Sequence, residues 1–330
     1  MKKVAINGLG RIGRATLKII MERSDMELVA VNDIAPIANM VYLLKYDTVY
    51  GRYEKEVCRS KDAKSIAIED YGFYYYSEKD PSQLPWKSHD IDVVFECTGL
   101  FTKTEELQKH LDAGAKQVIL SAPTKSEEMQ TVVHGVNKNE GNKQIISCAS
   151  CTTNCITPVV EVMKRRIGIE KATMSTIHAY TSTQSLVDTP ATKFKRGRAG
   201  AANMVPTTTG AATASAKALP DIKGKFNGVA VRVPIPAGSL ADIVFVTSKP
   251  TDRKELNDIF REEARSKRYK DILGVTEDGI VSADIVKDPR ASVVDLTMTQ
   301  VVDGDLVKIM SWYDNEWGYA SQMVKEAAQE

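Results

Sequence analysis

A glycine-rich turn near the N-terminus constrains this chain more than any other stretch. Residues Lys3–Asn7 have a strand-like apolar pattern, and the turn Gly8-Leu9-Gly10-Arg11-Ile12-Gly13 leads from them into a helical pattern through Ile20. A second strand pattern, Glu27–Asn32, ends at Asp33, twenty residues after the last glycine of the turn. This order of strand, glycine turn, helix, strand and acidic residue is typical of a dinucleotide-binding βαβ unit.

The glycines and the carboxylate also indicate which dinucleotide binds. Gly8, Gly10 and Gly13 let the turn close tightly and let the backbone approach a pyrophosphate at the helix N-terminus. The Asp33 carboxylate can accept hydrogen bonds from both ribose hydroxyls, and it would repel a 2′-phosphate. We therefore expect NAD rather than NADP as the cofactor.

Strand and helix patterns then continue to alternate. Strands are expected at Ile91–Gly99, Val118–Ser121 and Thr131–Val133, with a helix from Lys103 to Ala113. Such alternation predicts an open, doubly wound and largely parallel sheet that binds ligands at the C-terminal ends of its strands. Ser121 lies at such an end, where it either lines the cofactor groove or only turns the chain.

The most reactive position is expected at Cys151. The strand pattern Gln144–Ser147 precedes it and the helical pattern Ile156–Arg166 follows it, so the cysteine falls where a strand leads into a helix. Free backbone N–H groups and the helix dipole favour an anion at that point. We therefore expect an acidic Cys151 thiol that acts as a nucleophile.

The neighbouring cysteines allow two other interpretations, which fit less well. Cys148, Cys151 and Cys155 could bind a metal, but a metal site needs a fourth ligand and sulfurs that converge. A redox pair would place both thiols at the helix start, whereas Cys148 belongs to the strand. A single nucleophile with buried neighbours fits best, and no metal is expected; Cys58 and Cys97 are interpreted as structural.

Only four histidines are available to activate this thiol. His89 lies in a polar turn, His110 on a charged helix and His134 in a strand-like segment. His178 ends the strand pattern Met174–Ile177, close to a long loop, Ser182–Val205, that has no clear periodicity. This position makes His178 the best candidate base. The alternative is a histidine that only satisfies local hydrogen bonds.

Two further features indicate a phosphorylated small ligand. The basic run Lys193–Arg198 is too short for a nucleic-acid surface, and Arg232 places one charge inside the apolar strand Val229–Pro234. Pro206–Gly210 precedes a helical pattern and offers hydroxyls and free N–H groups to an anion.

The C-terminal half has a different pattern, with long alternating strands interrupted by few helices. We expect a cofactor domain at residues 1–150, a catalytic α+β domain at 151–315 with a mixed or antiparallel sheet and helices on one face, and a helix at 316–330 that packs back on the first domain. The expected elements are strands Ala172–Thr181, Gly228–Pro234, Asp242–Ser248, Ala291–Val302 and Leu306–Trp312, the last two joined by Asp303-Gly304, and helices Ala211–Lys217 and Asp252–Lys267.

Composition excludes several other functions. The 330 residues carry a formal charge of +1, so no overall field attracts nucleic acid or membrane. No apolar run reaches membrane-spanning length, and Met1-Lys2-Lys3 is not followed by a signal-peptide core. Five cysteines, an odd number, favour reduced thiols and a cytoplasmic location.

Several motifs together resemble phosphorylating glyceraldehyde-3-phosphate dehydrogenase. They cover the chain in order: Asn7–Arg14, Ala149–Asn154, Ile177–Thr181, Pro206–Ala212, Arg232–Pro234 and Tyr313–Tyr319. The resemblance implies a homotetramer with an N-terminal Rossmann domain and a catalytic domain whose long loop reaches a neighbouring subunit. It also implies glyceraldehyde 3-phosphate and inorganic phosphate as substrates, with erythrose-4-phosphate dehydrogenase of the same family as the alternative.

The resemblance assigns roles residue by residue. Cys151 resembles the nucleophile and His178 its activating partner, while Asp33 resembles the ribose acceptor. The residues similar to the rest of the cofactor site are Arg11, Ile12 and Asn315, and Lys79 stands where an arginine near the adenine is common. The residues similar to the C3-phosphate site are Thr181, Arg196 and Arg232, and those similar to the inorganic-phosphate site are Ser150, Thr152, Thr209 and Gly210.

Overall fold

The computed structural model describes residues 1–328, which form two compact units. The first unit contains Met1–Val132, Asn139–Ala149 and the chain from Met323, and the second contains Val133–Lys138 and Ser150–Gln322. Gln329 and Glu330, which belong to the predicted C-terminal helix, lie outside the described residues.

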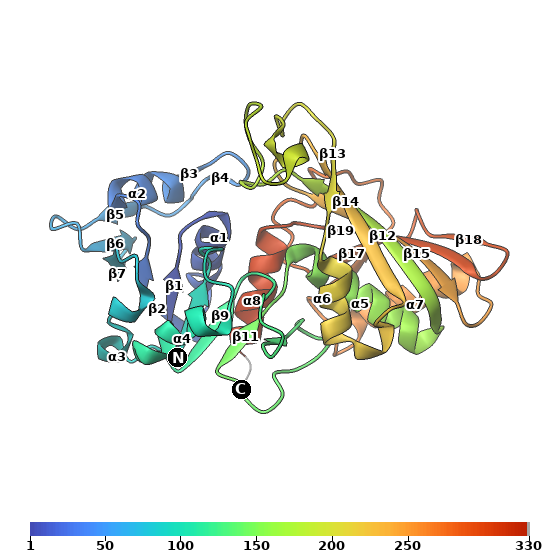
Figure 1. Ribbon diagram of the computed structural model, residues 1–330, viewed down its shortest axis with the longest axis horizontal. Coiled ribbons are helices and arrows are strands. Elements are labelled where there is room, and N and C mark those ends of the chain that lie inside the picture. Colours follow the sequence, from blue (N-terminus) through green and yellow to red (C-terminus); the bar gives the residue numbers. More distant parts are fainter. Residues whose placement is uncertain (329–330) are drawn as a thin grey trace. The chain divides into compact units, whose positions relative to one another are not determined.

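The first unit is built on a nine-stranded sheet (Figure 1). Its strand order is β10-β11-β9-β8-β1-β2-β7-β6-β5, and every pair from β10 to β7 is parallel. The strands are β1 (Lys2–Asn7), β2 (Met26–Asn32), β5 (Val57–Arg59), β6 (Ser65–Ile68), β7 (Tyr71–Tyr76), β8 (Val93–Glu96), β9 (Gln117–Leu120), β10 (Gln130–Thr131) and β11 (Ile145–Ser147). The prediction of an open, largely parallel sheet is confirmed.

Helices follow the strands of this sheet, as the alternating patterns predict. They are α1 (Arg11–Ile20), α2 (Ile37–Lys45), α3 (Trp86–His89) and α4 (Thr104–Asp112), with the short helix η1 (Pro81–Gln83). All four residues of β8 are buried, as expected for a central strand of a parallel sheet.

The edge of the sheet between residues 46 and 76 was not predicted. Strands β5, β6 and β7 form an antiparallel meander there, and β3 (Tyr46–Asp47) pairs with β4 (Gly51–Arg52) in a separate small sheet. These strands are short, and in β7 exposed tyrosines interrupt the apolar pattern. A sequence period of two is therefore hard to detect in this segment.

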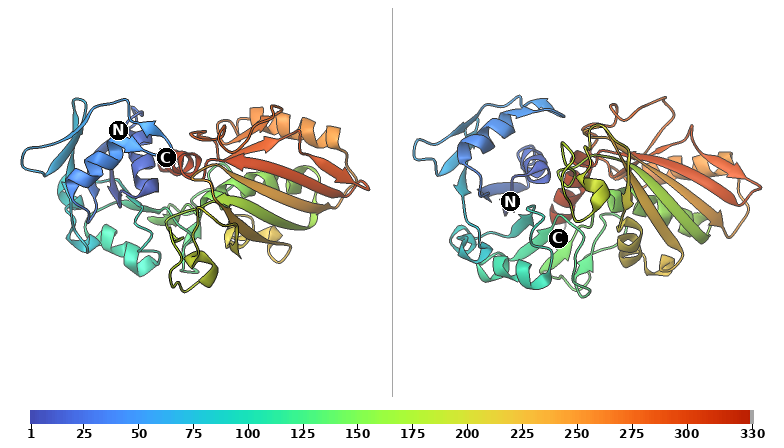
Figure 2. Two further views of the ribbon diagram at one scale, coloured as in Figure 1. Left: turned by 90° about the horizontal axis from the view of Figure 1, so that it is seen from above. Right: turned by 45° about the horizontal axis from the view of Figure 1, so that its top comes forward.

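The second unit contains an eight-stranded mixed sheet (Figure 2). Its order is β13-β14-β12-β15-β19-β17-β16, with β18 paired to β19, and only the pairs β12–β14 and β16–β17 are parallel. The strands are β12 (Ile169–Ala179), β13 (Val205–Thr208), β14 (Phe226–Val233), β15 (Ser239–Thr247), β16 (Leu273–Thr276), β17 (Ser292–Asp295), β18 (Gln300–Val302) and β19 (Leu306–Tyr313).

Three helices share one apolar core with this sheet. They are α5 (Cys151–Arg166), α6 (Ala211–Ala218) and α7 (Arg253–Arg265). The unit also contains the short helices η2 (Phe194–Gly197) and η3 (Pro220–Ile222). Helix α8 (Trp317–Ala328) begins in this unit, and its residues from Met323 belong to the first unit. Alternate residues of β15 are buried, among them Ala241, Ile243 and Phe245, which pack against Val159 and Met163 of α5 in this core. No helix among residues 1–328 has the length and apolar content needed to cross a bilayer.

One predicted strand is wrong in its extent. Ala291–Val302 is two strands, β17 and β18, because Asp295 ends the first one. Its Oδ1 accepts hydrogen bonds from the Thr297 backbone N at 3.1 Å and from the Thr297 hydroxyl at 2.6 Å, which turns the chain. The predicted Asp303-Gly304 turn between β18 and β19 is confirmed, since both residues have positive φ, 49° and 76°.

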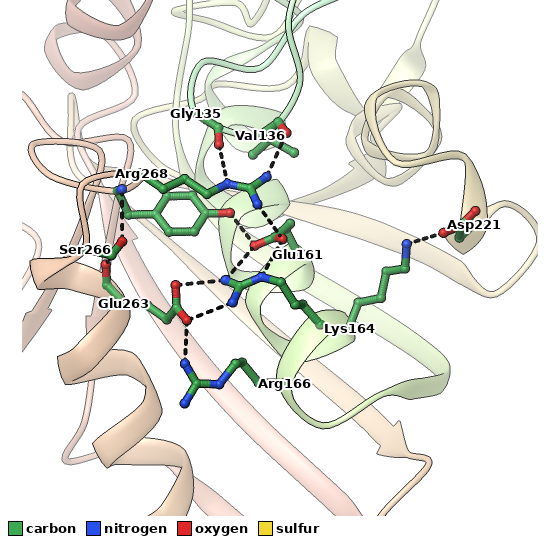
Figure 3. A network of polar contacts seen from close by, with 11 residues as sticks. Gly135, Val136, Glu161, Lys164, Arg166, Asp221, Glu263, Ser266 and Arg268 are labelled. Atoms are coloured by element: carbon green, nitrogen blue, oxygen red, sulfur yellow. Dashed lines mark hydrogen bonds and ion pairs between the residues drawn. The ribbon is translucent and has the colours of Figure 1, made fainter.

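A network of charged side chains joins the C-terminal end of α5 to α7 (Figure 3). The buried Glu263 carboxylate accepts hydrogen bonds from Arg165 at 2.8 and 3.0 Å and from Arg166 at 2.7 Å. Glu161 accepts from Arg165, from Arg268 at 3.0 Å and from the Tyr269 hydroxyl at 2.6 Å. Because the two carboxylates share Arg165, the network holds α5 against its neighbour.

The substitution Glu263→Gln should lower the free energy of unfolding by about 2 kcal/mol, because it removes charge-assisted hydrogen bonds from a buried site. Burial alone would raise the pKa of Glu263, but the hydrogen bonds from Arg165 and Arg166 outweigh it and hold the pKa below 4.5. The carboxylate therefore stabilises the fold above the unfolded-state pKa, and this contribution is lost as the pH falls.

Urea denaturation of the wild type and the variant at about pH 7 and about pH 4 measures both effects. The difference in stability should shrink at the lower pH. Glu262→Gln is the matched control, because the Glu262 side chain is 67% exposed and pairs with Arg166 alone among the described residues. A difference that does not change with pH would contradict this assignment.

Candidate active site

Cys151 is the first residue of α5, as the sequence predicts. Ala149 has a positive φ of 56°, which turns the chain sharply after β11, and Ser150 caps the helix by accepting a hydrogen bond from the Thr153 backbone N at 3.2 Å. Hydrogen bonds from the backbone N–H groups of Cys151 and Thr152 act on the sulfur. The thiol is therefore held at the positive end of the helix.

His178 lies opposite this thiol near the end of β12. Its Nε2 is 3.3 Å from Cys151 Sγ, which confirms the predicted proximity of the pair. Its Nδ1 lies 2.7 Å from the Ala179 carbonyl oxygen and 2.8 Å from Arg232 Nη1. With the proton on Nδ1 the ring donates to the carbonyl, and with the proton on Nε2 it accepts from Arg232, so both neutral tautomers have a partner.

The electrostatic surroundings of the pair differ from the prediction. Burial, and after it the charge of the nearby Arg232, lower the pKa of His178 to about 3, so the ring is neutral. Burial raises the pKa of the Cys151 thiol and outweighs Arg232 and the hydrogen bonds of Thr152, which lower it. The prediction of an acidic thiol is therefore wrong for this arrangement, in which the neutral thiol is favoured.

Two arginines flank the pair. The register of β12 and β14 places Arg232 directly beside His178, and its Nη1 also donates to the Ala179 carbonyl oxygen at 3.0 Å. Arg196 of η2 donates to Thr207 Oγ1 at 3.1 Å, and its charge acts on both His178 and Arg232. Among the described residues, the buried Arg232 Nε has no hydrogen-bond partner, and no carboxylate is among the charged groups that act on Arg232. An anionic ligand would supply a hydrogen-bond acceptor for Nε and a negative charge beside the guanidinium group.

The remaining predicted phosphate ligands lie at helix starts and in the long loop. Thr181 Oγ1 is 2.9 Å from Thr183 Oγ1, and Thr209 Oγ1 accepts from the Ala211 backbone N at 3.2 Å beside Gly210, the N-cap of α6. The Ser150 hydroxyl is engaged in capping α5. Thr152 is buried, with its hydroxyl 2.9 Å from the Tyr313 hydroxyl. The phosphate-binding roles of these residues remain predictions.

Tyr313 and Ser239 are parts of the site that the sequence analysis did not find. The Tyr313 hydroxyl also lies 2.8 Å from Thr176 Oγ1, and its ring meets the His178 ring edge-on at 6.0 Å. Ser239 accepts from the Ala179 backbone N at 3.2 Å and donates to Asn315 Oδ1 at 3.0 Å. Alternation along β15 and β19 places Ser239 and Tyr313 on buried faces of the sheet. A single sequence does not show which side chains they contact there.

The first unit contains a separate cavity of about 450 Å³ at the C-terminal ends of its parallel strands. It is lined by Asn7, Gly8, Gly10, Asn32, Asp33, Ile34, Glu78, Lys79, Cys97, Thr98, Leu100 and Phe101. Gly8 has a positive φ of 93°, and a Cβ on Gly13 would lie 1.9 Å from the Gly8 carbonyl oxygen. This close contact lies in the first turn of α1, which Arg11 and Ile12 begin, and the N-terminus of a helix favours an anion such as a pyrophosphate.

The predicted cofactor residues of this unit are only partly gathered around the cavity. Asp33 lines it, with Oδ2 accepting from the Leu9 backbone N at 2.7 Å and Oδ1 accepting from the Ala35 backbone N at 2.9 Å. Lys79 lines it as well. Ser121 follows β9 in the same sheet but is not among the described residues that line the cavity.

Comparison with known proteins decides the family. Residues 2–104 match the model for the NAD binding domain of glyceraldehyde 3-phosphate dehydrogenase, and residues 150–315 match the model for its C-terminal domain. The chain belongs to the glyceraldehyde-3-phosphate dehydrogenase family. All residues that line the cavity with its glycine turn lie within the segment that matches the NAD binding domain.

Curated family members resemble the chain over nearly its whole length. A glyceraldehyde-3-phosphate dehydrogenase from Streptomyces coelicolor is 44% identical over 326 residues, which cover 98% of this chain and 96% of that protein. One from Zymomonas mobilis is 41% identical over 331 residues, 99% of this chain and 98% of that protein. One from Clostridium pasteurianum is 44% identical over 332 residues, 98% of this chain and 97% of that protein.

The substitution Asp33→Asn should reduce the preference for NAD+ over NADP+ by about tenfold or more, because it removes the charge that repels a 2′-phosphate. The amide keeps an oxygen that can accept from the Leu9 backbone N. The measurement is kcat/KM with each cofactor. Asp25→Asn, a change of a carboxylate that pairs with Arg23 in the same unit, is the control and should leave the ratio unchanged. An unchanged ratio in Asp33→Asn would remove Asp33 from cofactor selection.

Proposed function

We propose that this family dehydrogenase oxidises D-glyceraldehyde 3-phosphate to 1,3-bisphosphoglycerate, with NAD+ and inorganic phosphate as co-substrates. The observation that supports it most is the contact at 3.3 Å between the partly exposed Cys151 thiol and the buried His178 imidazole, with Arg232 beside the imidazole. A thiol attacks an aldehyde, and the guanidinium groups suit a phosphorylated one. Arg196 and Arg232, together with Thr181, would hold the C3 phosphate.

The thiol and the imidazole would carry the first step. Cys151 Sγ attacks the aldehyde carbon while its proton passes to His178 Nε2, and a carbon–sulfur bond forms. The carbonyl oxygen becomes an oxyanion, which the imidazolium and the first backbone N–H groups of α5 stabilise. His178 can take the proton because its ring is neutral before the attack.

The second step would release the product. Bound NAD+ would supply the hydride acceptor: the thiohemiacetal carbon would lose a hydride while its oxyanion re-forms the carbonyl, which leaves a thioester on Cys151. Ser150, Thr152, Thr209 and Gly210 would bind inorganic phosphate so that one of its oxygens attacks the thioester carbon. The carbon–sulfur bond then breaks, and His178 returns the proton as the acid. Asn315 would hold the nicotinamide amide.

The substitutions Cys151→Ser and His178→Asn test this mechanism. Cys151→Ser should remove phosphate-dependent NADH formation, because a serine hydroxyl is a far weaker nucleophile than a thiolate. His178→Asn should lower kcat on the order of 10²–10⁴-fold, the usual effect of losing a positioned acid or base. NADH formation is followed by absorbance. Substantial activity in Cys151→Ser would rule out a thioester intermediate.

Erythrose 4-phosphate is the alternative substrate within the same family. Thr207–Ala212 matches the pattern for glyceraldehyde 3-phosphate, which favours the three-carbon aldehyde. We expect a higher kcat/KM for glyceraldehyde 3-phosphate when the two aldehydes are compared in the presence of NAD+ and phosphate. The opposite order would assign the protein to the erythrose-4-phosphate branch.

A homotetramer in the cytoplasm completes the proposal. Large apolar side chains of the long loop and β13 region are strongly exposed in the single chain: Leu186, Val187, Phe194 and Met204. Their burial against another subunit would remove this apolar surface from water. All five cysteines are free, which suits a reducing compartment. Light scattering should give about four times the chain mass of 36.4 kDa, and a monomer in solution would contradict the tetramer.

A further inference from the structure

The first unit contains a fully buried carboxylate that the proposed reaction does not use. Glu96 is the last residue of β8, and both it and His110 of α4 are 0% exposed. Burying a carboxylate costs free energy that only good hydrogen bonds offset. The arrangement of those hydrogen bonds indicates what Glu96 does.

Four donors from three residues converge on Glu96. Oε2 accepts from Asn7 Nδ2 at 2.6 Å and faces His110 Nε2 at 3.2 Å. Oε1 accepts from the Thr98 backbone N at 2.7 Å and from the Thr98 hydroxyl. Both oxygens are therefore fully used as acceptors.

The tautomer of His110 follows from its other neighbour. Trp86 Nε1 can only donate, and it lies 3.0 Å from His110 Nδ1, so Nδ1 is the acceptor. The ring proton is then on Nε2, where it is donated to Glu96. A chain of hydrogen bonds thus runs from Trp86 through His110 to the carboxylate.

The hydrogen bonds of Glu96 connect it to residues that line the cofactor cavity. Asn7 and Thr98, which Glu96 holds, both line that cavity. Asn7 Oδ1 accepts from Asn32 Nδ2 at 2.7 Å, and Asn32 Oδ1 accepts from the Glu78 backbone N at 2.8 Å, so the links continue through two more lining residues. Leu100, also in the lining, donates its backbone N–H to the Thr98 hydroxyl at 3.1 Å.

We infer that Glu96 is a positioning residue for the NAD cavity: it fixes the side chains at the ends of β1, β2 and β8 against which the cofactor lies. The inference concerns the family's NAD site and does not depend on which aldehyde is oxidised. An apolar residue at position 96 could fill the same space, but it could not hold Asn7 and Thr98 in fixed orientations.

The substitution Glu96→Gln tests this role with little change in volume. A glutamine has one acceptor oxygen, so its NH2 group faces donors that the carboxylate satisfied, and the lining must rearrange. We expect about a tenfold increase in Kd for NAD+ and for ADP-ribose in calorimetric titrations, since one unpaired buried donor has roughly that effect. KM for the aldehyde at saturating NAD+ should be unchanged.

Two further variants separate a positioning role of Glu96 from general damage to the fold, the first of them as a control. Glu263→Gln removes a hydrogen-bonded carboxylate from the second unit and should lower stability without changing the Kd of either ligand. Trp86→Phe is a second test rather than a control. It removes the hydrogen-bond donor to His110, at the end of the hydrogen-bond chain that lies outside the cavity lining. This variant should raise both Kd values by about two- to fivefold. It replaces Glu96→Gln as the test if that variant does not fold.

Wild-type affinity for NAD+ and ADP-ribose in a folded Glu96→Gln, or in Trp86→Phe if Glu96→Gln does not fold, would overturn the inference. An equal loss of cofactor and aldehyde binding would also overturn it, because it would show general disruption. Failure of the proposed substrate assignment would instead appear in the wild-type protein as a preference for another aldehyde, and it would leave the expected increase of both Kd values in Glu96→Gln unchanged.

Discussion

The 3.3 Å contact between Cys151 Sγ and His178 Nε2 is the interaction on which the proposed chemistry of the second unit depends. The contact is made in buried surroundings that disfavour charge on either partner, since burial lowers the pKa of the imidazole and raises that of the thiol. Both partners are therefore neutral, as a thiol and an imidazole, before the proposed proton transfer. Arg232, beside the imidazole, carries a fixed positive charge that would stabilise the negative charge formed in the proposed first step.

The fold keeps this contact in place by holding both partners on rigid elements. Residues 152–163 of α5 are all buried, and the end of this helix is bound to α7 through Glu263. His178 belongs to β12, which is paired on both sides along most of its length. Sites on packed helices and strands keep their geometry better than sites on loops. The long loop that contributes Arg196 can vary more without moving the thiol or the imidazole.

The cofactor unit follows a related principle with different groups. Its glycine turn lets backbone come close, since a Cβ on Gly13 would collide with the Gly8 carbonyl oxygen. Next to the cavity, buried polar side chains form a hydrogen-bonded network around Glu96. A fully satisfied polar network orients its members more strictly than apolar contacts do. Both units thus place buried polar groups where orientation matters and apolar groups where only volume matters.

The sequence by itself determined the βαβ unit, the position of Cys151 at a helix start and the choice of His178, because these depend on local patterns of glycine, polarity and period. It also indicated Arg232 as a buried charge in need of an anion. Only the tertiary structure decided the register that sets Arg232 beside His178, the contacts of Tyr313 and Ser239, and the meander at the edge of the first sheet. It also reversed the expected acidity of the thiol. Pairing register and burial arise from residues far apart in the chain, so no local pattern records them.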